Sequence, residues 1–456
     1  MNDIFSKFMN KTAAVLGAGI SNTPLIEFLV NAGAEVSVRD IKKIHEHDVE
    51  IINRYKSTGI KLYFGEDYLN NLNEQFIFRS PGIRPDSEHI KRAIKNGSVL
   101  TSETELFFEY FKGKIIAVTG SDGKSTTTTL IYELLKNQGI SCYLGGNIGT
   151  PLISFINTAT KDDIVVAELS SFQLMTFSKS PHIAVVTNIN PNHLDYHKDY
   201  DEYVDAKRNI CSHQQTNDAL IVNFDDEKSL SFADYARGEV RYFSLEQELE
   251  NGAYLKDNSI YYTKNGEREL VMASSDILIR GRHNIANYLA AITAVHTFVS
   301  REVIKKTAGT FKGVPHRLEL VKEINGVSFY NSSIDSSPSR TAAALSTFDE
   351  KIILIAGGKS KGVAFDALGE HVLAKVKVLI LTGMTAGEIH DSVVNAGDND
   401  GIKIIFENDF NRTVQTAYEH AAPGDCVLLS PASTSFDRFM NFEERGNIFK
   451  SLVEEL

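Results

Sequence analysis

Residues 117–126 read Ala-Val-Thr-Gly-Ser-Asp-Gly-Lys-Ser-Thr, and this stretch decides the fold. An apolar run precedes it and a helix-like segment follows it. A strand, a glycine loop and a helix in this order are typical of a phosphate-binding loop, because glycines let backbone N–H groups close around phosphate oxygens. Lys124 is then placed to reach the β- and γ-phosphates, and the hydroxyl of Ser125 or Thr126 to coordinate Mg²⁺. The motif departs from the usual loop in one respect, since Val118 occupies its first glycine position.

Short apolar runs alternate with helix-like segments along the rest of the chain. The runs are Ala13–Leu16, Ile115–Val118, Ile164–Ala167, Ile183–Thr187, Lys351–Ala356 and Val376–Leu381. Continuous runs rich in Val and Ile suit parallel strands that are buried on both faces, and helices between them indicate βαβ units. The sequence therefore predicts an α/β fold class.

The chain has 456 residues, more than one hydrophobic core supports, so several domains are expected. Strand–glycine-loop–helix starts near Gly17, Gly120 and Gly357 each mark the opening of an α/β domain. A hairpin at Arg317–Tyr330, with the strong type I′ turn signal Asn325–Gly326, begins the last one. The predicted domains are a Rossmann-like domain at residues 1–112, a P-loop ATPase-like parallel sheet at 113–314 and a C-terminal Rossmann-like domain at 315–456.

Composition excludes several classes of protein. The formal net charge is -12, whereas a nucleic-acid binder usually carries a basic surplus. The three cysteines, Cys142, Cys211 and Cys426, form no CxxC pair, which fits a reducing compartment. No stretch reaches the roughly 18 apolar residues that a membrane helix needs, and no signal peptide is recognisable. The sequence predicts a cytoplasmic protein that binds neither nucleic acid nor membrane.

Three polar side chains of the central segment are candidates for chemistry. Glu168 ends an apolar run, where a metal-binding carboxylate sits at the carboxyl edge of a sheet, although such an acid also caps helices. His193 follows another run and suits a metal ligand, a phosphate contact or a plain loop histidine. Lys207 lies in a helical pattern, which by itself predicts a solvated surface lysine.

The outer segments carry weaker loop motifs. Residues 15–22 read Val-Leu-Gly-Ala-Gly-Ile-Ser-Asn, a partial dinucleotide fingerprint with Asn22 in place of its third glycine. Asp40 follows the next strand, where an acid can bind a ribose. Near the C-terminus, residues 356–361 and 428–437 form small-residue loops after strands, and the last lysine of the first loop is a candidate anion clamp. Either loop is also compatible with a simple helix start.

Taken together, these motifs in this order resemble the Mur ligase family. The resemblance covers essentially the whole chain and is greatest to the branch that adds D-glutamate to UDP-N-acetylmuramoyl-L-alanine. It rests on Ser80–Ile83, Gly120–Thr126, Gly145–Gly149, Glu168–Gln173, His193, Lys207, Gly281–Asn287, Pro315–Arg317, Ser430–Ala432 and Asn441–Gly446.

The resemblance implies an ATP-dependent ligase of peptidoglycan precursor synthesis that works through an acyl-phosphate with two Mg²⁺ ions. The catalytic residues would be Lys124, His193 and Lys207. ATP would be bound by Gly120, Ser121, Asp122, Gly123, Lys124, Ser125, Thr126, Asn284, Asn287 and Arg317. The metal ligands would be Ser125, Glu168, His193 and Lys207, the last one carbamylated. The UDP substrate would contact Ile20, Ser21, Asp40, Gly82, Asn147, Ser170 and Gln173. D-Glutamate would be held by Lys361, Ser435, Phe436 and Phe442.

One segment departs from the family pattern. After the hairpin the family usually carries Asp-Ser-Lys-x-Thr-Asn, whereas residues 332–337 here read Ser-Ser-Ile-Asp-Ser-Ser. The usual Asp and Lys are thus replaced by Ser332 and Ile334, and Asp335 and Arg340 are the candidates to substitute for them. A smaller change is Asp122, where Asn is common.

Other functions compete with this interpretation. A nicotinamide dehydrogenase would use the N-terminal glycine loop, but that loop lacks its third glycine and the central loop is far better formed. A non-catalytic nucleotide-binding paralogue is favoured by the changes at Ser332 and Ile334. Another amino-acid-adding member of the family is the nearest rival, although the chain has no Asp-Asn-Pro-Arg motif. The protein is expected to be a monomer.

Overall fold

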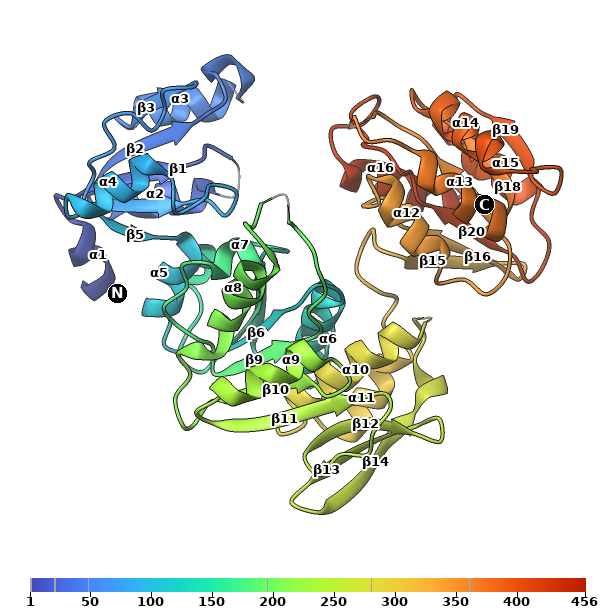
Figure 1. Ribbon diagram of the computed structural model, residues 1–456, viewed down its shortest axis with the longest axis horizontal. Helices are drawn as coiled ribbons and strands as arrows, with labels where there is room; N and C mark the ends of the chain where they lie inside the picture. The colour runs from blue at the N-terminus through green and yellow to red at the C-terminus, as the bar shows by residue number, and fades with distance from the viewer. Residues whose placement is uncertain (1, 20–21, 48, 195, 280, 361) are drawn as a thin grey trace. The chain divides into compact units, whose positions relative to one another are not determined.

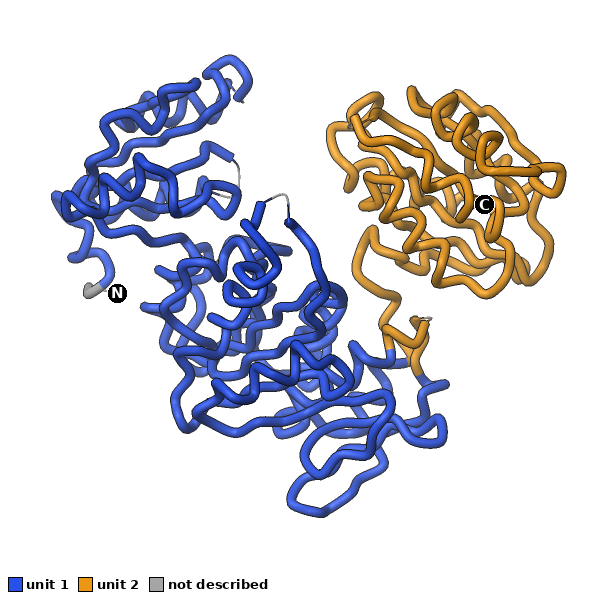
Figure 2. The backbone as a smooth tube through the Cα atoms, viewed as in Figure 1, with its two compact units in different colours: residues 1–276, 285–308 blue, residues 277–284, 309–456 orange. Residues whose placement is uncertain are grey.

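The computed structural model describes residues 2–19, 22–47, 49–194, 196–279, 281–360 and 362–456. Its contacts divide the chain into two compact units (Figure 2). One comprises Met1–Asp276 and Ile285–Ala308, and the other Ile277–Asn284 and Gly309–Leu456. The units contain three sheets made mainly of parallel strands, which confirms the α/β class.

The first sheet has the strand order β3-β2-β1-β4-β5 and is entirely parallel (blue in Figure 1). Its strands are β1 (Thr12–Leu16), β2 (Glu35–Asp40), β3 (Lys61–Phe64), β4 (Phe76–Arg79) and β5 (Val99–Thr101). The helices of this segment are α1 (Asn2–Phe8), α2 (Thr23–Asn31), η2 (Ile44–Glu46), α3 (Val49–Ser57), α4 (Glu88–Lys95) and α5 (Glu103–Tyr110). The central strand β1 is buried, and its carboxyl end leads into the glycine loop at Gly17.

The second sheet has the order β14-β13-β12-β11-β10-β9-β6-β8-β7. Its strands are β6 (Lys114–Thr119), β7 (Cys142–Gly146), β8 (Ile164–Glu168), β9 (Ile183–Val186), β10 (Ala219–Asn223), β11 (Glu239–Ser244), β12 (Gly252–Lys256), β13 (Ser259–Lys264) and β14 (Glu267–Ala273). Its helices are α6 (Lys124–Asn137), η3 (Leu152–Phe155), α7 (Ser171–Leu174), α8 (Tyr200–Ser212), α9 (Glu227–Leu230), η4 (Ser231–Tyr235), η5 (Ser274–Asp276), α10 (Arg282–Val295) and α11 (Arg301–Ala308). The strands from β7 to β12 pair in parallel, and β13 and β14 extend the sheet antiparallel.

The antiparallel extension is a feature that the sequence analysis does not predict. Two turns build it, at Asp257–Asn258 and at Asn265–Gly266, and all four residues have positive φ. This conformation is that of type I′ hairpin turns, for which an Asn-Gly pair is the strongest short-range signal. The signal at Asn265–Gly266 was therefore present in the sequence.

The third sheet has the order β15-β16-β20-β17-β18-β19. Its strands are β15 (Glu319–Ile324), β16 (Val327–Asn331), β17 (Ile352–Ala356), β18 (Val376–Leu381), β19 (Lys403–Phe406) and β20 (Cys426–Leu429). Its helices are α12 (Pro338–Leu345), α13 (Asp366–Lys375), α14 (Ala386–Ala396), α15 (Phe410–Glu419) and α16 (Phe442–Glu454). The predicted hairpin is confirmed, since β15 and β16 pair antiparallel and Asn325 and Gly326 have φ of 50° and 80°.

All six predicted apolar runs lie in strands, namely β1, β6, β8, β9, β17 and β18. The predicted boundaries after residues 112 and 314 stay predictions, because the first two sheets share one compact unit. Helix α5 shows why they do. Its Leu106 packs in the core of the first sheet, whereas Phe107 and Phe108 pack in the core of the second. One helix thus belongs to two cores.

Two glycines of the third sheet's helices offer a matched test of close packing. Gly369 in α13 lies against the Ser392 carbonyl of α14, where an added Cβ would come well inside 3.0 Å, whereas nothing lies near Gly387. Both substitutions by Ala gain the same intrinsic helix preference. We expect Gly369→Ala to lower the free energy of unfolding by about 1–3 kcal/mol through overpacking. Gly387→Ala should leave it equal or higher. Urea denaturation measures both, and equal stability of the two variants would contradict the observed packing.

Candidate functional site

The loop at residues 120–123, here called the Gly120 loop, joins β6 to α6 and contains two glycines with positive φ, 147° at Gly120 and 77° at Gly123. A Cβ at Gly120 would overlap the Thr187 hydroxyl, and one at Gly123 would overlap the Asn287 side chain of α10. Neither position has room for a side chain. The structure thus brings the predicted loop and the predicted Asn287 into contact.

Lys124, the first residue of α6, turns its side chain back over the loop. Its Nζ donates to the Gly120 carbonyl at 3.0 Å and to the Ser121 carbonyl at 2.9 Å. On the other side of the loop, the Ser121 hydroxyl donates to the Asn190 carbonyl at 2.8 Å. The loop is therefore held in one shape with a positive charge against it, as a phosphate site requires.

Glu168 ends β8 beside this loop and is only 1% exposed. Its Oε1 accepts a hydrogen bond from the Asn147 side-chain amide at 2.6 Å. Its Oε2 is buried and has no hydrogen-bond partner among the described residues. A buried carboxylate oxygen without a partner is costly, so this oxygen indicates a place for a cation or a donor. Asn147, a predicted substrate contact, instead positions Glu168 here.

Lys207 corrects the interpretation that its helical pattern alone suggested, because it is 2% exposed and not a surface lysine. Its Nζ donates to the Gly120 carbonyl at 2.7 Å. Burial, and then the charge of Lys124, lower its pKa well below the usual value for lysine, against the opposing charge of Glu168. The signal was available, since Lys207 lies four residues after the buried Tyr203, on the same face of α8.

His193 lies in the loop after β9 with φ of 55°, and its ring centroid is 4.8 Å from that of Phe172. Within the described ranges, no three His, Cys, Asp or Glu side chains gather in a way that could hold a metal ion. The predicted metal set includes only Glu168 and His193 of these residue types, with Ser125 and Lys207 completing it.

His197 is a buried residue of this region that the sequence analysis did not single out. Its Nε2 lies 3.0 Å from the Ser171 hydroxyl, and its ring stacks on Phe172 with centroids 5.6 Å apart. Burial lowers its pKa below the usual value for histidine. A single histidine in a loop gives no periodic signal, so sequence alone had no means to find it.

Ser170 and Gln173 form the capping box of α7. The Ser170 hydroxyl and backbone N–H both lie 2.9 Å from Gln173 Oε1, and the Gln173 N–H donates back to the hydroxyl. These two predicted substrate contacts therefore have a structural role in starting α7. Asn284, a predicted ATP contact, lies one turn before Asn287 in α10.

In the first sheet, Asp40 lies at the carboxyl end of β2, where it binds the neighbouring glycine loop. Its Oδ2 accepts from the Ala18 N–H at 2.7 Å. Asn22 joins the same loop to the next one, since its amide donates to Ser80 Oγ at 2.8 Å. Gly82 in that second loop is exposed and has open space around it. The predicted contacts Ile20 and Ser21 lie outside the described residues.

Arg84 connects the first sheet's loops to the central helix α8. Its Nη2 donates to Glu202 Oε1 at 2.9 Å, and its Nε donates to Asp86 Oδ1 at 2.9 Å. These contacts with Arg84 lower the pKa of Glu202 to about 2. Arg79 makes a second connection, donating to the Phe172 carbonyl at 2.8 Å.

In the second unit, the two predicted small-residue loops lie side by side. The N–H of Lys359 donates to the Thr434 carbonyl at 2.9 Å, and the N–H of Thr434 donates back at 3.0 Å. Ser435 follows directly and is buried, whereas Phe436 is 64% exposed. The predicted Lys361 lies outside the described residues.

The remaining predicted residues of this unit lie around the start of the third sheet. Phe442 begins α16, and its ring centroid is 5.9 Å from that of His316. Arg317 follows His316 and donates its backbone N–H to Val314.

Asp335, the candidate substitute for the usual acid, is buried beneath this region. Its Oδ2 accepts a hydrogen bond from the Ser430 hydroxyl at 2.9 Å. Burial raises the pKa of Asp335 to about 6, although Arg317 and Arg340 act in the opposite direction. Arg340 donates to the Ile334 carbonyl at 3.2 Å. The altered segment therefore keeps a carboxyl group, in a buried position with two arginines near it.

Comparison with known proteins agrees along the whole chain. The model of the Mur ligase middle domain matches residues 118–295, and that of the Mur ligase, glutamate ligase domain matches residues 316–433. A Ruminiclostridium cellulolyticum protein named UDP-N-acetylmuramoylalanine--D-glutamate ligase is 50% identical over 98% of this chain and 97% of its own. A protein of the same name from Acetivibrio thermocellus is 50% identical over 100% and 99%.

A solved structure shares the fold. It is a MurF ligase from Thermotoga maritima in complex with ADP, with a TM-score of 0.55, 17% identity and coverage of 100% of both chains. In the described part of the chain, no helix is both long and apolar enough to span a membrane.

The pairing of Glu202 with Arg84 predicts a pH-dependent stability. Because the folded pKa of Glu202 is about 2 and the unfolded value is near about 4.3, the stabilisation is present above the unfolded value. It is lost as the pH falls toward the folded value. We expect Glu202→Gln to lower the free energy of unfolding by about 1–2 kcal/mol at pH near 7. The difference from wild type should shrink as the pH falls below about 4.

The matched control is Glu227→Gln, since Glu227 is exposed and makes no ion pair with any described residue. Urea denaturation across this pH range measures both variants. A difference for Glu202→Gln that stays constant with pH would show that the ion pair does not stabilise the fold.

Proposed function

This chain belongs to the Mur ligase family, and from that premise we propose that it joins D-glutamate to UDP-N-acetylmuramoyl-L-alanine, with cleavage of ATP. The observation that carries the proposal is the convergence of Lys124 and Lys207 on the Gly120 carbonyl, next to the buried Glu168. The names of the relatives at 50% identity over the full length support the same substrates.

We assign the three sheets to three roles. Residues 1–112 form a Rossmann-like domain for the UDP substrate, 113–314 a P-loop domain for ATP, and 315–456 a Rossmann-like domain for the amino acid. The order β3-β2-β1-β4-β5 of the first sheet supports the first role, since the fold that binds dinucleotides has the same order for these strands. The reducing cytoplasm is the proposed location, supported by three unpaired cysteines. The protein is proposed to act as a monomer.

The residues around the Gly120 loop fit ATP and Mg²⁺. The unpartnered Oε2 of Glu168 suits a cation, and the loop leaves no room for side chains where phosphates would bind. Ser125 and Glu168 would hold one Mg²⁺, and His193 and Lys207 the other. Mg²⁺ would offset the negative charge of the phosphates. Lys207 serves as a ligand only after carbamylation, which converts its amine into a carboxylate, and its buried amine is suited to this reaction.

The proposed reaction requires no nucleophile from the protein. The carboxylate of the UDP substrate attacks the γ-phosphorus of ATP, giving an acyl-phosphate and ADP. The amine of D-glutamate then attacks the acyl carbon, loses a proton, and inorganic phosphate leaves. Lys124 lowers the repulsion between the carboxylate and the phosphates. Catalysis therefore depends chiefly on positioning three ligands together.

The outer loops would select the other two substrates. Asp40 and Gly82, with Ile20 and Ser21, would bind the UDP end, and Asn147, Ser170 and Gln173 the muramoyl-alanine part. The residues assigned to D-glutamate are Lys361, Ser435, Phe436 and Phe442. Asn284, Asn287 and Arg317 would complete the ATP site.

A second candidate function is nucleotide binding without catalysis. The replacement of the usual Asp and Lys by Ser332 and Ile334 favours it, and both of those positions lie beside the buried Asp335. The first prediction below separates the two functions.

We expect purified protein with ATP and Mg²⁺ to release phosphate only when UDP-N-acetylmuramoyl-L-alanine and D-glutamate are both present. L-Glutamate in place of D-glutamate is the matched control, because it has the same charge and size. A colorimetric phosphate assay measures the rates. Protein that binds ATP but shows no stimulation by any amino acid would instead support the non-catalytic function.

Two lysines of α6 provide a matched pair of variants. Lys124→Ala removes the charge at the Gly120 loop, and we expect phosphate release to fall by about 100-fold or more, as when a transition-state charge contact is lost. Lys136→Ala, in the exposed last turn of the same helix, should keep nearly the wild-type rate. Both rates are measured at saturating substrates, with circular dichroism to verify folding. Wild-type activity of Lys124→Ala would refute the role of this lysine.

A further inference from the structure

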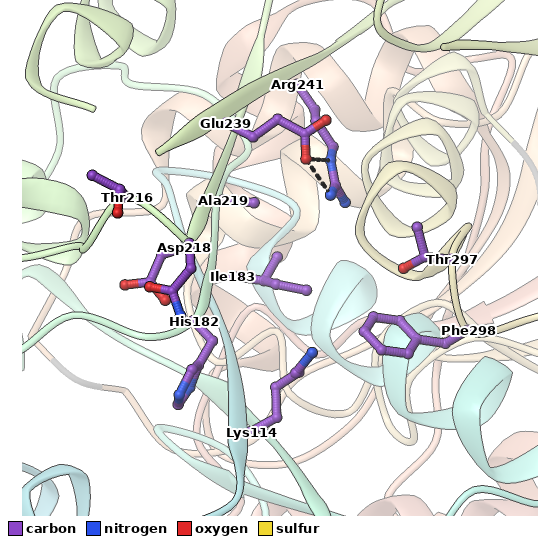
Figure 3. Close-up of a pocket in the computed structure, with 11 residues that line it drawn as sticks. Lys114, His182, Ile183, Thr216, Asp218, Ala219, Glu239, Arg241, Thr297 and Phe298 are labelled. Atoms are coloured by element: carbon purple, nitrogen blue, oxygen red, sulfur yellow. Dashed lines mark hydrogen bonds and ion pairs between the residues drawn. The ribbon is translucent and has the colours of Figure 1, made fainter. Parts of the chain in front are cut away.

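We propose that this protein has a second anion site, for a small molecule that carries a diphosphate group, at the amino-terminal edge of the central sheet. A cavity of about 390 Å³ lies there (Figure 3). It is lined by residues at the starts of β6, β9, β10 and β11 and by Thr297 and Phe298, which follow α10. The Gly120 loop lies at the opposite end of β6, roughly 20 Å away for a strand of six residues. The site is thus separate from the proposed ATP site.

Arg241 is the buried polar group of this cavity. Its side chain is 9% exposed, and its Nε and Nη2 both donate to Glu239 Oε2, at 2.9 and 2.5 Å. Its Nη1 is buried and has no hydrogen-bond partner anywhere in the described chain. A buried guanidinium N–H without an acceptor is costly, so this atom points to an anionic or polar ligand.

Further cations surround the cavity without acidic partners. No carboxylate of a described residue lies within 4.0 Å of the charged groups of Lys114, Lys179 or Arg237. Lys114 lines the first cavity, and its Nζ lies 4.8 Å from the ring centroid of Phe298. Lys179 and Arg237 line a neighbouring cavity of about 440 Å³, which shares His182 with the first. The two cavities form one cation-rich area on a protein with a net charge of -12.

The two carboxylates of the first cavity already have hydrogen-bond donors. Asp218 Oδ2 accepts from the backbone N–H of Gln215 at 2.7 Å, and Glu239 is bound by Arg241. They therefore offset only part of the positive charge. Figure 3 shows the Lys114 ammonium and the Arg241 guanidinium both directed toward the space between them.

His182 contributes a neutral donor to both cavities. Its Nδ1 accepts the backbone N–H of Ile115 at 3.1 Å, so in the neutral ring the proton is on Nε2. Burial lowers the pKa of His182 below its usual value, which favours this neutral form. An N–H donor next to Lys114 suits a ligand oxygen and does not suit a metal cation.

The charge and size of the area select the ligand class. Three cations without acidic partners and one partly paired arginine call for several negative charges on a small molecule, which a diphosphate supplies and a single carboxylate does not. Arginine also binds phosphate oxygens in a fork geometry. Both inorganic pyrophosphate and a nucleoside diphosphate present this group, and the experiment distinguishes them.

The test is lysine footprinting of the full-length protein. An amine-acetylating reagent is applied with and without pyrophosphate at about 1 mM, in the concentration range of weak metabolite sites. Sodium chloride keeps the ionic strength equal, because salt alone screens surface charges. Mass spectrometry then reads each lysine separately. We expect acetylation of Lys114 and Lys179 to fall by about fivefold or more at a saturating ligand concentration, while the exposed Lys56 of the first sheet is unchanged.

A parallel series with ADP identifies the source of the diphosphate. Lys124 reports binding at the Gly120 loop in the same samples, so the two sites are read apart. Protection of Lys114 by ADP at a lower concentration than by pyrophosphate assigns the site to a nucleotide, and the reverse assigns it to an inorganic anion. Equal acetylation of Lys114 and Lys179 in pyrophosphate and in sodium chloride overturns the proposal.

A variant supplies a second measurement. Arg237→Gln removes an exposed cation that no described acid pairs with, and it should reduce the protection of Lys179 at least threefold, a loss of roughly 0.7 kcal/mol in binding. Lys56→Gln is the matched control and should keep full protection. Ligase activity should be normal in both. Undiminished protection in Arg237→Gln would exclude the neighbouring cavity from the site.

Discussion

The close approach of the backbone around Gly120 is the constraint on which the proposed site depends. The carbonyl of this residue accepts hydrogen bonds from two lysines that are 83 residues apart in the chain, Lys124 and Lys207. The loop cannot carry a side chain at Gly120 or Gly123, because Thr187 and Asn287 occupy that space. One backbone turn thereby joins β6, β9, α6, α8 and α10, and the proposed chemistry lies where they meet.

Two groups at this turn are buried at a cost that the fold does not recover by itself. Lys207 loses hydration, and its amine lies near the charge of Lys124. Glu168 has one carboxylate oxygen without a partner among the described residues. Buried charges are normally paired, so an incompletely paired acid and a buried amine indicate a site that is completed by its ligands. The same reasoning applies to Arg241 at the other end of the sheet, where the guanidinium has one unsatisfied nitrogen.

The first sheet is connected to this region by packing and by ions. Phe107 and Phe108 of α5 enter the central core, while Leu106 stays in the first. Arg84 and Arg79 reach α8 and the backbone of Phe172. These contacts explain why the first two sheets form one compact unit, although each begins with its own glycine loop. They also place the loop of the proposed UDP site against the segment that carries His193 and His197.

The amino-acid sequence by itself determined the elements with strong local signals. Buried runs of Val and Ile predicted strands, the Gly120 loop followed from its glycines, and Asn325–Gly326 predicted a hairpin turn, because each of these depends on neighbouring residues alone. Tertiary structure decided what depends on distant partners. Lys207 was predicted at the surface by its pattern and is buried because α8 packs on β6. His197, the pairing of Asn147 with Glu168 and the burial of Asp335 were equally inaccessible to local patterns, since their partners lie 21 to 95 residues away.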